Sequence, residues 1–234
     1  MRSILKYIIL PCAALALFSC AREVPGYSDT MFGGDYTENA VNSAIKNNET
    51  ITALVTVKQD AGGRTYLHYS DEVKVFCDLP FTRQVRAMCT GRILGKSEVD
   101  GYYNGLVMWM EELDEGTFTY DTSVAGADGL DLPDSWISML SDGYLSLEYS
   151  TWWGEHPVKH DFYVVAGTDE NDPYCLELRQ NSHDDPHDVL SDGIVCFDVN
   201  ALPDTGGETK TLKLKYRKTD GSVAVREFGF KTRQ

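Results

Sequence analysis

The sequence has no excess of positive charge. Its 234 residues hold 21 Lys and Arg against 36 Asp and Glu, a formal net charge of −15 at pH 7. Because a chain with this much negative charge repels a phosphate backbone, we expect no nucleic-acid binding. The charge is uneven, because residues 51–113 hold eight acidic and seven basic residues while most of the acidic excess follows residue 113.

Sequence motifs of the common enzyme classes are missing as well. The chain has no GxSxG nucleophile elbow, no HExxH zinc motif, no P-loop and no GxGxxG turn after a strand. The paired carboxylates of a glycosidase have no sequence signature, so the sequence is silent on that class. We therefore expect a protein that is not an enzyme and that needs no cofactor.

The histidines and acidic groups do not form a recognisable metal motif. His183 and His187 lie four residues apart, but Pro186 lies between them and its neighbours are typical of a loop, not of a helix that would bring two ligands together. The acidic groups at 169–172 and 184–192 do not follow the order of an EF-hand loop. We predict no metal site and interpret these residues as solvated turns.

The apolar run at residues 7–18 is too short for a membrane-spanning helix, which needs about 20 residues. It follows Arg2 and Lys6, an order typical of a signal peptide. The segment 17–20 (LFSC) resembles the lipobox of bacterial lipoproteins, which implies cleavage after residue 19 and lipid attachment to the thiol of Cys20. The alternative is a secretory signal with an incidental cysteine.

We predict a signal peptide at 1–19 and a membrane partner reached through the lipid on Cys20. Because Ala21 follows the cysteine where inner-membrane lipoproteins have Asp, we expect the outer membrane. The choice between its periplasmic and outer faces stays open. Residues 20–50 are rich in Gly, Asn, Thr and Ser, which predicts a flexible tether with at most one helical turn near 37–46.

The remaining chain predicts an all-β fold in two domains. Runs rich in β-branched and aromatic residues, separated by Gly and Pro, indicate strands nearly throughout. Five runs predict a small OB-like barrel at 51–120. An acidic connector at 114–133 leads to seven further runs, which predict an antiparallel β-sandwich at 121–234. The Asp-Gly pairs that begin at Asp142, Asp192 and Asp220 are expected in turns or at loop ends.

Four cysteines remain after the predicted lipobox: Cys77, Cys89, Cys175 and Cys196. Each neighbouring pair falls on consecutive predicted strands, and strand alternation places Cys175 and Cys196 on polar faces. Because an exposed free thiol is at risk in an oxidising compartment, these two are candidates for a disulfide. Cys77 and Cys89 are a second candidate pair, but they alternate with apolar residues, so two buried thiols are the competing interpretation.

Trp152 and Trp153 are the candidate ligand-contact residues. Adjacent strand residues point to opposite faces, so one tryptophan belongs to the core and the other faces outward. An exposed tryptophan is typical of a site that stacks on a sugar or anchors a protein contact. The alternative is that the outer ring only covers the edge of a sheet.

Several segments of the second half resemble the NigD-like lipoproteins of Bacteroidota. They are 142–147 (DGYLSL), 176–181 (LELRQN), 195–199 (VCFDV), and 214–216 with the Asp-Gly turn at 220–221. The resemblance implies an N-terminal OB domain, a C-terminal β-sandwich and a place in the cell envelope. It points to a bacteriocin-related role without naming a reaction.

We therefore interpret the chain as a non-catalytic binding or interaction module of the envelope, with a protein or a glycan as its ligand. One alternative is a surface carbohydrate-binding protein of a glycan-uptake system. A further alternative is an immunity-like protein that protects against a bacteriocin.

Overall fold

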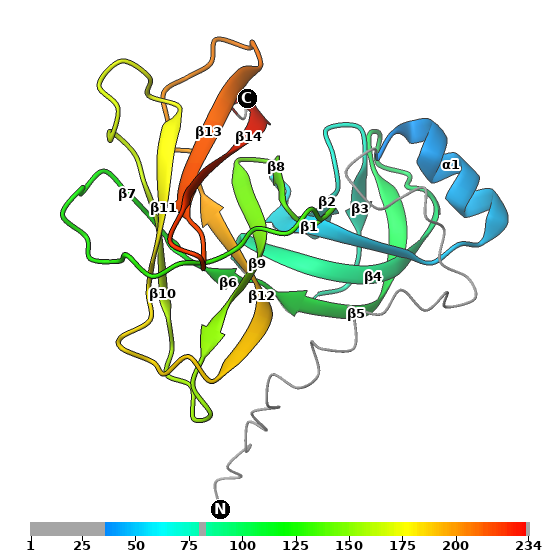
Figure 1. Cartoon of the computed structure of the whole chain (residues 1–234). Coiled ribbons are helices and arrows are strands. Elements are labelled where there is room, and N and C mark those ends of the chain that lie inside the picture. The colour runs from blue at the N-terminus through cyan, green and yellow to red at the C-terminus, as the bar shows by residue number, and fades with distance from the viewer. Residues whose placement is uncertain (1–35, 80–82, 233–234) are drawn as a thin grey trace, which may run out of the picture.

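The computed structural model describes residues 36–79 and 83–232 and shows a barrel packed beside a β-sandwich (Figure 1). The predicted signal peptide and the predicted lipidation site Cys20 lie outside these residues. Within the described ranges, no helix has both the length and the apolar character needed to cross a membrane.

The end of the predicted tether folds onto the barrel. Helix α1 (Glu38–Asn47) is capped by the side chain of Thr37, and its residues Val41 and Ala44 are buried in the barrel core. The structure thus differs from the predicted tether of 20–50 over residues 36–48. Two buried side chains on a ten-residue helix leave too weak an apolar period to be recognised in the sequence.

The barrel is closed by five strands in the order β1-β2-β3-β5-β4. They are β1 (Ile51–Gln59), β2 (Thr65–His68), β3 (Lys74–Phe76), β4 (Val85–Lys96) and β5 (Tyr103–Glu112). Small apolar side chains such as Val55, Val57, Leu67 and Val75 alternate along the strands and fill the interior. Strands β3 and β5 pair in parallel, and the other neighbours are antiparallel. The predicted small barrel is confirmed.

The sandwich consists of two sheets, and the predicted all-β class is confirmed. One sheet has the order β14-β13-β11-β10-β7 and the other β6-β12-β9-β8. The strands are β6 (Asp114–Glu115), β7 (Thr117–Thr119), β8 (Met139–Ser141), β9 (Tyr144–Trp153), β10 (Asp161–Val165), β11 (Cys175–Asn181), β12 (Val189–Asp198), β13 (Lys210–Arg217) and β14 (Val223–Phe230). Three pairs, β7–β10, β11–β13 and β6–β12, are parallel, so the sandwich is not wholly antiparallel.

The sandwich begins earlier than the predicted boundary at residue 121. Strands β6 and β7 lie within the predicted barrel range, yet each pairs with a sandwich strand. They are two and three residues long, and Gly116 separates them. Such short strands carry no alternation that a sequence reading can detect, so their sheet is known only from their partners.

The Asp-Gly pairs fall in different places. Asp142 (φ 52°) and Gly143 (φ 75°) form the tight turn between β8 and β9, and Gly221 (φ 84°) lies in the turn between β13 and β14, as predicted. Gly193 instead lies inside β12, opposite Tyr149 of β9. A Cβ at this position would overlap the Tyr149 hydroxyl, so the glycine makes room for a ring.

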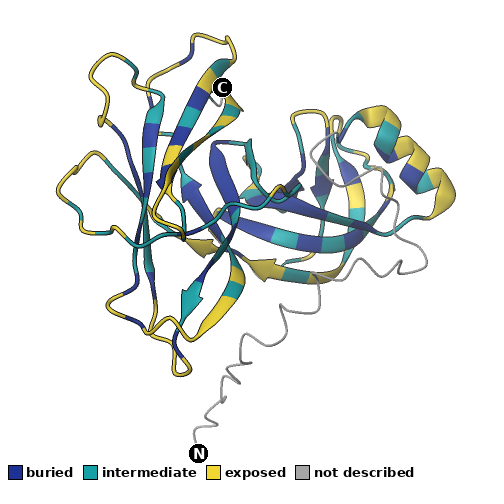
Figure 2. Ribbon diagram, in the orientation of Figure 1, coloured by how far each residue is buried: buried dark blue, intermediate teal, exposed yellow. Residues whose placement is uncertain are grey.

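The barrel and the sandwich share a buried junction. Strands β9 and β12 run between the barrel and the five-stranded sheet, and buried residues follow them through the junction (Figures 1 and 2). Leu54 of β1 and Leu113 pack there with Tyr144 of β9 and Cys196 of β12. Because an apolar cluster belongs to both parts, the two units hold a fixed mutual orientation.

The predicted disulfides are absent, since Cys77, Cys89, Cys175 and Cys196 are all free thiols in the structure. Strands β11 and β12 follow one another in the sequence but belong to opposite sheets, so Cys175 and Cys196 are not cross-strand neighbours. Strand β5 lies between β3 and β4, which separates the strands of the other pair. Cys77 and Cys89 instead pack in or against the barrel core, in keeping with the competing interpretation of buried thiols.

Candidate functional site

The two adjacent tryptophans lie at the end of β9, at one tip of the sandwich, and they face opposite sides of the sheet. Trp153 packs against the sandwich core and stacks on His160, with ring centroids 3.9 Å apart and planes 8° apart. Trp152 faces outward beside Leu190 of β12 and stacks on His187 with centroids 6.0 Å apart. Only Trp152 is therefore available as a contact residue.

A buried polar network fixes this tip. His160 Nε2 lies 3.0 Å from Asp185 Oδ2, and its Nδ1 lies 2.7 Å from Gln180 Nε2. The other end of the Gln180 amide accepts a hydrogen bond from the Thr151 hydroxyl at 3.0 Å. Gly154 N–H donates to Asp185 at 3.0 Å and, with His160, holds the pKa of that carboxyl below its usual range.

The same network is sealed from solvent. A His–Asp pair orients the general base of many hydrolases. Here the side chain of His160 is 0% exposed and that of Asp185 is 1% exposed, and the Trp153 ring covers the imidazole. A substrate in solvent does not reach either group in this conformation. The pair instead joins the loop after β9 to the loop before β12 and makes the tip rigid.

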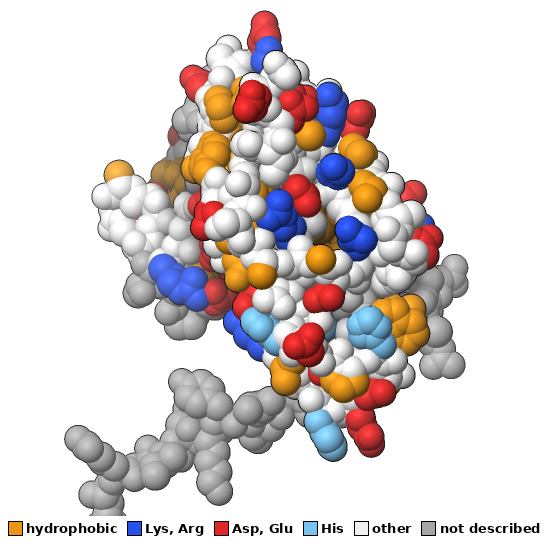
Figure 3. All heavy atoms as spheres, turned by 60° about the vertical axis from the view of Figure 1, so that its left-hand side comes forward, with side chains coloured by type: hydrophobic (Ala, Val, Ile, Leu, Met, Phe, Trp, Pro, Cys, Tyr) orange, Lys and Arg blue, Asp and Glu red, His pale blue; other side chains and the backbone are white. Residues whose placement is uncertain are grey.

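Above this network lies an exposed apolar surface. We define the tip surface as Trp152, His187 and Leu190. Leu190 is 50% exposed and pairs with Trp152 across the β9–β12 ladder, so these two side chains share a face, and His187 stacks on the Trp152 ring. Figure 3 shows histidine and hydrophobic side chains close together toward the bottom of the view. Exposed apolar side chains on a rigid support are typical of an interaction site.

The loop histidines are held by single partners. His183, at a positive φ of 53°, lies 2.8 Å from Asp161 through Nε2, while His187 stacks on Trp152. In residues 36–79 and 83–232, no three His, Cys, Asp or Glu side chains are arranged to hold a metal ion together. These two histidines thus pair with different neighbours instead of converging on one point.

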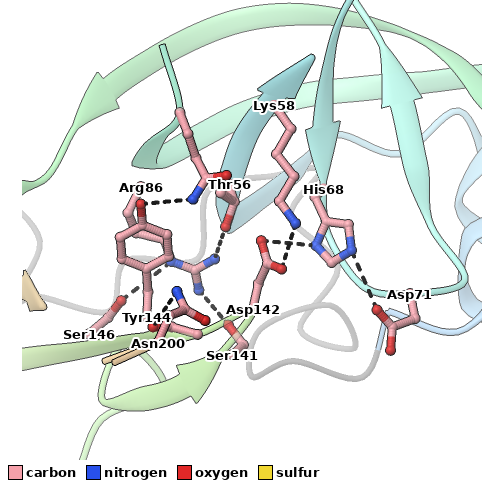
Figure 4. Close-up of polar contacts among 12 residues, drawn as sticks. Thr56, Lys58, His68, Asp71, Arg86, Ser141, Asp142, Tyr144, Ser146 and Asn200 are labelled. Atoms are coloured by element: carbon pink, nitrogen blue, oxygen red, sulfur yellow. Dashed lines mark hydrogen bonds and ion pairs between the residues drawn. The ribbon is translucent and has the colours of Figure 1, made fainter. Parts of the chain in front are cut away.

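A second polar cluster lies at the junction of barrel and sandwich (Figure 4). Its centre is Arg86 of β4, which is 3% exposed. The guanidinium donates to Ser141 Oγ (2.6 Å) and to Thr56 Oγ1 (3.2 Å). A longer hydrogen bond of 3.4 Å reaches Ser146 Oγ. Burial lowers the pKa of Arg86 to about 10, although the charge of Asp142 opposes the shift.

The turn at Asp142 adds an ion pair to the junction. Lys58 Nζ of β1 lies 2.7 Å from its Oδ1, and His68 Nδ1 lies 3.4 Å from its Oδ2. Burial lowers the pKa of His68. Burial also disfavours the Asp142 carboxylate, yet the hydrogen bond from Lys58 and the nearby His68 leave its pKa below the usual range. This cluster fastens the two units together.

Neither of these two polar clusters was predicted from the sequence. For Gln180 a signal was present, because it continues the inward-facing row of Leu176 and Leu178 and is only 1% exposed. A polar side chain in an apolar row needs a buried partner, which here is His160. Arg86 and Asp142 had no such signal, since their partners lie far away in the sequence.

Comparison with known proteins places this fold. A family model described as the NigD-like C-terminal beta sandwich domain matches residues 112–230. No curated protein matches the chain. Among solved structures, a protein from Parabacteroides distasonis described as toxin-related is 26% identical with a TM-score of 0.65, covering 79% of this chain and 94% of its own.

Two further structures are similar in fold. A NigD-like immunity protein from Bacteroides caccae is 17% identical with a TM-score of 0.54, covering 75% of this chain and 91% of its own. A protein from Bacteroides fragilis described as a lipoprotein is 14% identical with a TM-score of 0.53, covering 80% and 100%. With the match over 112–230 and the barrel that precedes it, this chain belongs to the NigD-like family.

Proposed function

We propose that this protein is a lipid-anchored component of the bacterial cell envelope that binds another protein without catalysing a reaction. The LFSC segment at 17–20 supports the anchor at Cys20, with the outer membrane as its location. The observation that carries the binding role is the pairing of partly exposed Trp152 with exposed Leu190, next to the buried His160–Asp185 network that holds the tip.

The chemistry of the tip surface favours a protein ligand over a glycan. A sugar ring that stacks on tryptophan also needs polar groups around its edge for the hydroxyls. Here the partner of Trp152 across the ladder is Leu190, whose side chain is 50% exposed. An exposed aliphatic side chain beside an aromatic ring is typical of the centre of a protein interface. A surface glycan-binding protein of an uptake system is the competing function.

The Bacteroides caccae neighbour supports one class of ligand. Because that protein is described as an immunity protein, we propose a bacteriocin as the ligand of this chain. Capture of a toxin polypeptide by an anchored, rigid tip needs no catalysis. Deletion of the gene then sensitises cells to a bacteriocin encoded nearby, and restoring the gene with Trp152→Ala fails to protect them.

Site-specific photocrosslinking in living cells tests the binding site. A benzoylphenylalanine in place of Leu190 is expected to crosslink to one specific protein. The same group in place of Val223, which is similarly exposed on β14, is expected to crosslink to none. The purified partner then binds the wild type, and Trp152→Ala weakens binding at least tenfold, as expected for a central anchor.

Three results would count against this function. Equal crosslinking from both positions would show that the tip surface has no special role. Saturable binding on a glycan array that Trp152→Ala abolishes would establish the carbohydrate-binding alternative. Failure of labelled fatty acid to enter the wild type, or equal labelling of Cys20→Ser, would remove the lipid anchor.

A further inference from the structure

One outer face of the barrel carries more apolar surface than strand alternation would produce. On β5, Val107 and Met110 both pack against the barrel core, although alternation would send them to opposite sides. A register shift between β4 and β5 occurs here, with Val107 opposite Gly91 but Trp109 opposite Thr90. This is a β-bulge, in which one strand carries an extra residue.

The bulge turns two consecutive side chains outward. Met108 is 58% exposed and Trp109 is 42% exposed. Leu106 of β5 (55%) and Leu94 of β4 (59%) are exposed on the same pair of strands. We define the barrel face as these four side chains, Leu94, Leu106, Met108 and Trp109. Large exposed apolar groups on adjacent strands indicate a surface that another apolar phase covers.

The chain that leads to Cys20 joins the barrel and not the sandwich. The first described residue, Tyr36, is buried in the barrel core, and Glu38 forms a 2.6 Å ion pair with Lys96. Lys96 lies two residues beyond Leu94 on β4. Fifteen residues separate Cys20 from Tyr36. Fully extended they reach about 55 Å, and because they lead into the barrel, the barrel is nearer than the sandwich to the anchor along the chain.

The charge distribution agrees with the same orientation. Residues 51–113 hold eight acidic and seven basic residues, whereas residues 114–234 hold 23 acidic and ten basic ones. An anionic lipid surface repels the sandwich and leaves the nearly neutral barrel free to approach. Tryptophan is enriched at the membrane interface, where its amphipathic ring lies among the head groups, and Leu and Met reach the acyl chains beyond.

We infer that the barrel face lies on the bilayer that holds the anchor, with Leu94, Leu106, Met108 and Trp109 inserted at the interface. This inference rests on the lipid anchor proposed above. The contact turns a single covalent attachment into a two-point attachment, because the lipid at Cys20 keeps the barrel face near the surface at all times. It therefore sets the direction in which the sandwich and its tip surface leave the membrane.

Tryptophan fluorescence in vesicles tests the contact. The full lipidated protein is reconstituted into vesicles of phosphatidylethanolamine and phosphatidylglycerol, with or without brominated acyl chains, which quench nearby tryptophan. The chain has four tryptophans. We expect brominated vesicles to quench part of the wild-type emission, Trp109→Phe to lose that quenching, and Trp152→Phe to retain it.

A matched pair of double variants provides the second measurement. Leu106→Ser with Met108→Ser is expected to lose the quenching of Trp109, whereas Val223→Ser with Val225→Ser leaves it unchanged. Val223 and Val225 are 57% and 58% exposed on β14, so they control for the loss of exposed apolar surface as such. Because all four positions are exposed, both variants are expected to fold, and circular dichroism checks this.

The outcomes separate this contact from the anchor itself. Quenching that persists in Trp109→Phe, or its absence in wild-type protein that carries fatty acid on Cys20, would overturn the membrane contact while leaving the anchor intact. Self-association that depends on Leu106 and Met108, without quenching, would assign the barrel face to a second copy and overturn it too. A wild-type chain without fatty acid would remove the anchor and the contact together.

Discussion

The guanidinium of Arg86 is the interaction whose removal should most weaken the attachment of barrel to sandwich. It is buried, and it holds the hydroxyls of Ser141 and Ser146 from the sandwich and of Thr56 from the barrel. We predict that Arg86→Met destabilises the protein, because these hydroxyls stay at the junction while their cationic donor is lost.

The magnitude follows from opposing contributions. Each hydrogen bond from a charged donor contributes about 1.5–3 kcal/mol, and removal of one partner of a buried charge network costs about 3–5 kcal/mol. Methionine restores part of the lost packing and relieves the desolvation that lowers the pKa of Arg86 to about 10. We expect a net loss of about 3 kcal/mol, which lowers the melting temperature of a chain of this size by about 6–12 °C.

Calorimetry distinguishes weakening of the junction from loss of core packing. We expect the wild type to unfold in one transition and Arg86→Met in two, because the barrel and the sandwich no longer unfold together. Arg83→Met is the control, since Arg83 is exposed and pairs with the exposed carboxylate of Glu112. If Arg86→Met melts as one unit at the wild-type temperature, the junction does not depend on this cation and the reasoning is refuted.

Three further predictions follow from the buried groups. Burial lowers the pKa of His68. As the pH drops below about 6.5, His68 is therefore protonated in the unfolded chain before it is protonated in the folded protein, and the free energy of unfolding falls. His68→Gln should reduce this pH dependence in urea unfolding measured at a series of pH values. The thiols of Cys77, Cys89 and Cys196 should react with a disulfide reagent only after unfolding, because burial raises the pKa of each to about 12; fast reaction of these three in the folded protein, or fewer than four reactive thiols after unfolding, would contradict this. Gly116→Ala should cost about 1–3 kcal/mol in chemical denaturation, because its Cβ would overlap the Phe197 ring; unchanged stability would show that the ring moves aside.

The strands were accessible from the sequence because their signal is local. Runs such as 51–58 and 210–217 correspond to β1 and β13, since alternation of side chains is written in consecutive residues. Helix α1 was predicted only as a helical turn near 37–46, for the converse reason. Its exposed residues outnumber Val41 and Ala44, and the burial of these two comes from the barrel beneath them.

The candidate site was accessible in part. Adjacent tryptophans in a strand had to face opposite sides, and Trp153 does lie inward while Trp152 lies outward. The sequence did not show which of the two rings faces inward, or that His160 stacks on the inner ring. Both follow from the packing of the loops on either side of the strand. The barrel face depended on a bulge that moved Trp109 outward, and a bulge has no alternation pattern of its own.

By itself, the sequence determined the all-β class, the sequence ranges of most strands and two of the three Asp-Gly turns, because each depends on neighbours a few residues away. Only the tertiary structure decided which sheet received each strand, and with it the fate of the cysteines. Cys175 and Cys196 lie on successive strands, yet the chain crosses between sheets after β11 and leaves both thiols free. Which strands pair depends on how much apolar surface each whole sheet face buries. Residues far apart in the sequence contribute to that burial, so no short segment predicts the pairing.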